Sequence, residues 1–89
     1  MKHETIYLKL KPFFKEKKAT FHIKVTETSA LDIADDAVNI TSFDDESEYF
    51  KYIGEMKDRD VLTYVDSTKS EFDEAFIVLV GKINELSKI

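Results

Sequence analysis

The chain has 89 residues and a formal net charge of -5, with 43% hydrophobic and 35% charged residues. This length predicts a single domain over residues 1–89, with one hydrophobic core. The sequence contains no cysteine, which excludes disulfides and thiolate metal sites, and no apolar run of about 20 residues, which excludes a membrane-spanning helix. Because the first residues lack the apolar run of a signal peptide, we expect a cytoplasmic protein.

The first quarter of the chain predicts an antiparallel β-hairpin. Segments 5–11 and 20–26 carry an apolar side chain at every second position, which is typical of half-buried strands. Pro12 ends or edges the first strand, and the residues after it form a connection longer than a tight turn. The alternating apolar residues are Ile6, Leu8, Leu10, Phe21, Ile23 and Val25.

The next segment fits two structures. Ser29 and Asp32 match a short capping box, which indicates a turn or short helix over 28–36, whereas Leu31 and Ile33 alternate as a strand would. Residues 37–41 predict a short third strand through Val38 and Ile40, which lies at an edge of the sheet.

Two helices and one strand are predicted in the second half. Ser42 marks the start of a helix over 43–57, and Val61–Val65 is rich in β-branched residues on both faces, which indicates a central strand. Ser70 begins a C-terminal helix with one apolar stripe, formed by Phe72, Phe76, Leu79, Ile83 and Leu86. The order β-β-β-α-β-α predicts an α+β fold, with a mostly antiparallel sheet of three to four strands and two helices on one face.

Chemical motifs are weak throughout the chain. His3 and His22 are the only histidines; without a metal-ligand spacing we interpret them as exposed sheet residues and expect no metal or other cofactor. The two glycines, Gly54 and Gly81, fall inside helical patterns, so there is no phosphate-cradling loop or nucleophile elbow. We therefore expect neither an enzyme nor a small-molecule substrate.

Charge is divided unevenly along the chain. Residues 1–24 carry seven Lys against two acidic residues, whereas residues 25–50 carry eight carboxylates and no Lys or Arg. One face of the predicted hairpin is basic and aromatic, and two interpretations fit it: a nucleic-acid-binding surface that stacks bases, or a solvated face whose lysines prevent edge pairing. This face comprises Tyr7, Lys9, Lys11, His22 and Lys24.

The base-free stretch from Val25 to Phe50 is the main functional signal. Clustered like charges destabilise a fold by repulsion, and their field steers basic partners, although solubility alone also explains them. A row of carboxylates at helical spacing is similar to the phosphates along a nucleic-acid strand. The acidic residues that we expect to bind a partner are Asp32, Asp35, Asp36, Asp44, Asp45, Glu46 and Glu48.

In this charge pattern the chain resembles small phage-encoded inhibitors that mimic DNA. Such inhibitors block host nucleic-acid-binding proteins, for example histone-like nucleoid proteins, polymerases, repair glycosylases or CRISPR nucleases. The resemblance implies a basic protein partner in the host cytoplasm. Ile77 and Val78 point away from the apolar stripe of the last helix, so this helix is either buried on more than one side or shared with a second subunit in a homodimer.

Overall fold

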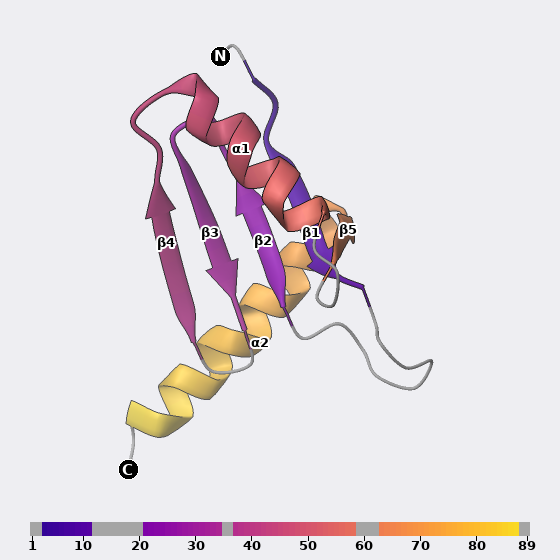
Figure 1. The fold of residues 1–89 in the computed structure, drawn as a ribbon. Helices are drawn as coiled ribbons and strands as arrows, with labels where there is room; N and C mark the ends of the chain where they lie inside the picture. The colour runs from indigo at the N-terminus through magenta and orange to yellow at the C-terminus, as the bar shows by residue number, and fades with distance from the viewer. Residues whose placement is uncertain (1–2, 12–20, 35–36, 59–62, 88–89) are drawn as a thin grey trace.

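The computed structural model describes residues 3–11, 21–34, 37–58 and 63–87. These residues form one antiparallel sheet and two helices, so the predicted α+β class is confirmed (Figure 1). The described part of the sheet has five strands rather than three to four, in the order β4-β3-β2-β1-β5. The elements are β1 (Ile6–Leu10), β2 (His22–Val25), β3 (Ser29–Ile33), β4 (Val38–Ser42), α1 (Glu46–Lys57), β5 (Tyr64–Asp66) and α2 (Lys69–Ser87).

The first four strands form a meander in which each strand pairs with the next in sequence. Leu8 lies opposite Ile23 in the predicted hairpin, and the ambiguous segment after it is a strand, β3. A tight turn decides this outcome, because Thr26 donates its N–H to the Ser29 carbonyl at 2.8 Å and its hydroxyl accepts the Ser29 N–H at 3.2 Å. Ser29 therefore closes a hairpin instead of capping a helix.

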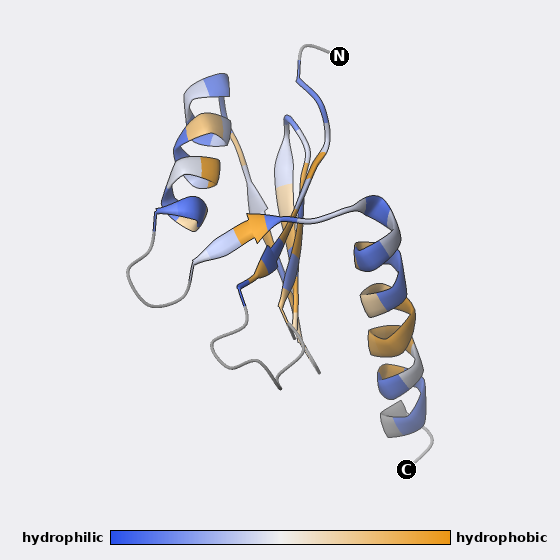
Figure 2. Cartoon of the chain, turned by 90° about the vertical axis from the view of Figure 1, so that its right-hand side faces the viewer, coloured by the Kyte–Doolittle hydropathy of each residue, from blue (hydrophilic) through white to orange (hydrophobic). Residues whose placement is uncertain are grey.

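The two helices lie on opposite faces of the sheet, so the prediction that they share one face is wrong (Figure 2). Strands β1 and β3 carry apolar side chains on both faces. Leu8 belongs to the cluster under α1, whereas Tyr7, Leu31 and Ile33 belong to the cluster under α2. A sheet with two apolar faces needs a covering layer on each side.

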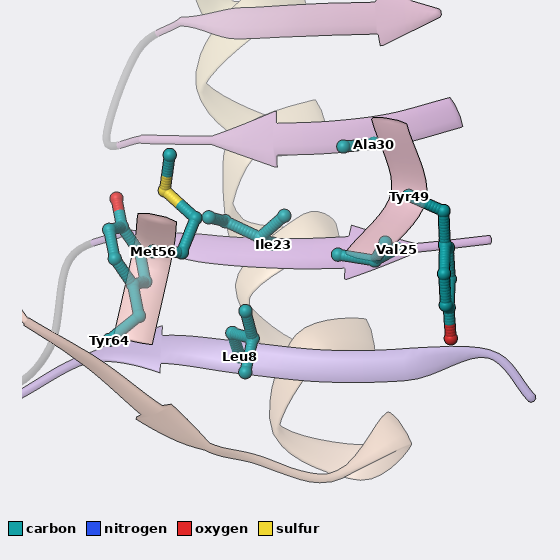
Figure 3. Close-up of a cluster of buried hydrophobic side chains, with 7 residues drawn as sticks. All are labelled: Leu8, Ile23, Val25, Ala30, Tyr49, Met56 and Tyr64. Carbon is teal, nitrogen blue, oxygen red and sulfur yellow. The ribbon is translucent and has the colours of Figure 1, made fainter. Parts of the chain in front are cut away.

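The larger part of the core lies between the sheet and α1 (Figure 3). Leu8, Ile23 and Val25 are completely buried there. Full burial of such a side chain contributes about 1.5–3 kcal/mol, so these residues hold strands β1 and β2 against the helix. Ala30 of β3, Tyr49 and Met56 of α1, and Tyr64 of β5 complete the cluster.

The core under α2 is smaller. Phe72 and Leu79 are buried as the apolar stripe predicts, but Phe76 and Ile83 are 39% and 45% exposed. The C-terminal end of α2, which contains Ile83, projects beyond the strands (Figure 1). The helix begins at Lys69 rather than Ser70, because the Thr68 hydroxyl accepts the Glu71 N–H at 3.1 Å and caps the first turn. The side chain of Leu86 is outside the described residues.

β5 is an edge strand and not the central strand that its composition indicates. It pairs with β1 and stands at one end of the strand order. Tyr64 is apolar and buried because it packs in the cluster under α1, not because strands flank it on both sides. Val61 and Leu62 of the predicted strand lie outside the described residues.

Candidate functional site

The first turn of α1 is built from acidic side chains. Asp45 is the N-cap, and its carboxylate accepts the Ser47 hydroxyl at 2.7 Å and the Glu48 N–H at 3.1 Å. Glu48 in turn accepts the N–H of Asp44. The helix therefore begins after Asp45, three residues later than predicted, because the Asp45 carboxylate satisfies the Glu48 N–H, one of the groups that a helix leaves unpaired at its start.

These hydrogen bonds also fix the charge of Asp45. The Ser47 hydroxyl and, after it, the Glu48 N–H hold the pKa of the Asp45 carboxyl below its ordinary value. The carboxylate form is also favoured by the positive end of the helix dipole. Asp44, Asp45 and Glu46 are exposed, so the start of α1 presents negative charge to solvent.

Tyr49 joins this turn to the N-terminal segment. Its side chain is only 3% exposed, and its hydroxyl donates to the Glu4 carbonyl at 3.1 Å. Burial and, after it, the negative charges of Glu4 and Glu27 raise the pKa of the Tyr49 phenol. The Tyr49 hydroxyl therefore holds the Glu4 backbone beside the first turn of α1.

A third contact brings the β2–β3 turn to the same place. Phe43 donates its N–H to the Thr28 carbonyl at 2.9 Å, which sets the turn containing Glu27 beside the residue before Asp44. Figure 1 shows the N-terminal segment, this turn and the start of α1 at the same end of the sheet. Segments 3–5, 26–28 and 43–48 contain no Lys or Arg. We call their carboxylates the acidic end: Glu4, Glu27, Asp44, Asp45, Glu46 and Glu48.

The acidic end contains only part of the predicted acidic surface. Asp32 lies in the middle of β3, paired with Ile23 on one side and Asn39 on the other, and is apart from the start of α1. Asp35 and Asp36 lie outside the described residues. The base-free stretch is thus not one surface.

Two acidic residues at this end were missed. Glu4 lies in the lysine-rich N-terminal segment, and Glu27 lies in the base-free stretch, but no sequence pattern places either beside Asp44. The β2–β3 turn could have placed Glu27, because the β2–β3 and β4–α1 connections of the meander lie at the same end of the sheet.

His3 packs against the acidic end. Its ring stacks on Tyr49 with centroids 4.9 Å apart and meets the edge of Phe50 at 5.1 Å, and its Nε2 lies 3.4 Å from the Glu46 carboxylate. Within the described residues no three His, Asp or Glu side chains are arranged to hold a metal ion. His22 is 8% exposed, so its interpretation as an exposed sheet residue is wrong.

The predicted basic and aromatic face is largely covered by α2. The Tyr7 ring packs 5.8 Å from that of Phe72, and Lys9 forms an ion pair with Glu71 at 3.1 Å. The strand alternation put these side chains on one face correctly, but this is the face that the second helix occupies. Only the end of the face, at Lys11, is exposed, so the nucleic-acid-binding interpretation loses its stacking surface.

Comparisons of the chain with protein-family models, with curated proteins and with solved structures find no match. No helix in the described ranges combines the length and the apolar character needed to cross a membrane. A shallow hollow lies between the end of β4 and α1. It is lined by Thr41, Ser42, Phe43, Glu48, Lys51, Tyr52 and Glu55.

Proposed function

We propose that this protein is a cytoplasmic, protein-binding inhibitor or regulator that presents its acidic end to the basic, nucleic-acid-binding surface of another protein. A histone-like nucleoid protein is an example of such a partner. The supporting observation is that two contacts, Tyr49 with Glu4 and Phe43 with Thr28, bring three acid-bearing chain segments together at the start of α1.

The charge arrangement supports electrostatic recognition. Asp44, Asp45 and Glu46 follow one another in the sequence at the exposed start of a helix, so they project a local negative field without an interposed base. A basic groove that holds phosphates can accept such a row of carboxylates. Association driven by this field is fast and weakens as salt rises.

Solubility is the competing explanation for the acidic end. For solubility alone, a surface with interspersed charges of both signs is sufficient. The acidic end instead combines acids from three segments that contain no Lys or Arg. Concentrating one sign costs stability through repulsion, which solubility does not require.

A charge-neutralising variant tests the proposal. Asp44→Asn, Asp45→Asn and Glu46→Gln remove three charges, and Asn at position 45 keeps a good N-cap, so the fold is retained. Affinity for a purified histone-like nucleoid protein is measured by fluorescence anisotropy over a salt series, together with displacement of labelled DNA. We expect a loss of at least about tenfold at low salt, which corresponds to roughly 1.4 kcal/mol, and a shallower salt dependence.

The matched control removes three exposed carboxylates from elsewhere. Asp58→Asn, Glu74→Gln and Glu85→Gln change the net charge equally and lie outside the acidic end. Under the proposal this control keeps most of the affinity. Equal losses in both triple variants would show that net charge alone matters, and no binding by the unchanged protein would reject this partner class.

A further inference from the structure

β4 stands at one end of the strand order, so no strand of the described residues pairs with its outer edge. The Ala34 N–H bonds to the Ala37 carbonyl and the Phe43 N–H to the Thr28 carbonyl, both at 2.9 Å. Hydrogen-bonded and non-hydrogen-bonded pairs alternate along an antiparallel ladder, so positions 37, 39, 41 and 43 turn their backbone groups toward β3. Val38, Ile40 and Ser42 therefore turn theirs outward.

The same edge carries exposed apolar side chains. Val38 and Ile40 are 44% and 67% exposed. In the register they lie opposite Ile33 and Leu31, which belong to the α2 side of the sheet. Because α2 packs mainly on β2 and β3, these two side chains continue the apolar surface past the helix without a cover.

The two edges of the sheet differ in their protection against pairing. β5 has three residues, and its Asp66 forms an ion pair with Lys57 at 2.8 Å. β4 has five residues, and none of them is charged. Short strands and charged side chains are the usual means by which proteins block edge pairing, so β5 is blocked and β4 is open.

We infer that β4 is a docking edge to which an extended segment of a partner protein adds as a further strand. The segment carries apolar side chains at alternate positions, which pack beside Val38 and Ile40, and Lys or Arg near its end, which meet Asp44 and Asp45. Main-chain hydrogen bonds supply affinity in this mode, and the alternate side chains supply specificity. The basic character of the segment rests on the function proposed above.

A second copy of this chain is a poorer occupant because of charge. Each copy has a net charge of -5. A pairing of two β4 edges therefore joins two molecules of like net charge, which repel each other. A basic segment reverses the sign of these interactions.

A synthetic peptide tests the docking edge directly. The probe alternates valine and threonine and has a pair of lysines at each end; a second peptide has glutamates in place of the lysines. Binding is followed by amide chemical shifts and by hydrogen exchange. We expect the lysine peptide to shift and protect the amides of Val38, Ile40 and Ser42, and to bind on the order of tenfold more tightly than the glutamate peptide.

Matched variants separate edge binding from general adhesion. Ile40→Thr and Ile77→Thr make the same change at two strongly exposed positions, and only the first lies on β4. Loss of binding by Ile40→Thr alone, and by a peptide N-methylated on the residues that face β4, supports the inference. Equal losses in the two variants, unchanged binding of the methylated peptide, or a protein dimer with protected β4 amides would overturn it.

The same experiments distinguish the two proposals. If Ile40→Thr leaves peptide and partner binding intact while the acidic-end variant abolishes partner binding, only the docking edge fails. If the lysine peptide protects β4 but neutralising Asp44 and Asp45 changes neither its affinity nor that of the partner, the acidic-end function fails and an uncharged strand site remains.

Discussion

Replacement of Tyr49 by Phe tests how the acidic end is assembled. The substitution keeps the buried ring and removes the hydroxyl that donates to the Glu4 carbonyl at 3.1 Å. A hydrogen bond of this kind contributes about 0.5–1.5 kcal/mol. We expect the free energy of unfolding at neutral pH to fall by about 1 kcal/mol, and Tm by about 4–8 °C for a domain of this size, measured by urea and thermal unfolding.

The pH dependence gives a second, independent readout at Tyr49. Burial, then Glu4 and Glu27, raise the pKa of this phenol above its ordinary value of 10.0. The folded protein thus holds the phenol proton more tightly than the unfolded chain, which contributes stability below that ordinary value. This stability is lost as pH rises through the folded-state pKa. Tyr49→Phe should remove this part of the alkaline loss.

The carboxylates themselves provide the control for this test. Glu27→Gln should lower the pKa of Tyr49 toward its ordinary value, read from phenolate absorbance, because one of the negative charges that raise it is gone. Glu74→Gln on α2 is exposed and should leave that titration unchanged. An unaltered titration in Glu27→Gln, or full stability in Tyr49→Phe, would refute the arrangement described for the acidic end.

Substitutions at three further positions probe the scaffold. Leu79→Ala should lower the free energy of unfolding by about 2–5 kcal/mol, since Leu79 is 2% exposed under α2; a loss near zero by urea unfolding would contradict that packing. Asp45→Ala should lower Tm, whereas Asp45→Asn should keep it because Asn is also a good N-cap. As pH falls below about 4, Asp45→Asn should lose less stability than the unchanged protein, because the lowered pKa of Asp45 contributes stability only above that range. Gly81→Ala should raise stability by about 0.5–1 kcal/mol, because nothing lies within 4 Å of the added Cβ; a destabilised variant would indicate that the exposed side of α2 is occupied.

Local patterns predicted most of the strands and both helices of this fold. Alternation placed Leu8 and Ile23 on strands, and β-branched Val38 and Ile40 identified an edge strand correctly. The faces of the sheet were harder to predict, because Leu31 on the side opposite Leu8 was assigned to an ambiguous segment. In a predicted sheet without β3, only one face is fully apolar, so a single layer of helices is sufficient to cover it.

The candidate site shows the same limit. The carboxylates that follow one another in sequence, Asp44 and Asp45, were found directly. Glu4 joins them through the hydroxyl of Tyr49, a contact between residues far apart in the chain. Periodicity reports local order only, so such a contact cannot be derived from a single sequence.

The strand order has a consequence for the sequence of folding events. β1 to β4 pair between neighbours along the chain, whereas β5 must bring Asp66 back to Leu8, and closing a longer loop costs more entropy. We expect the meander to be structured in the folding transition state and α2 to dock after it, so Leu79→Ala should speed unfolding with little change in the folding rate. Until that docking, Tyr7 and Leu31 face water, and newly made chains are most prone to aggregate while the β4 edge and this apolar face are exposed together.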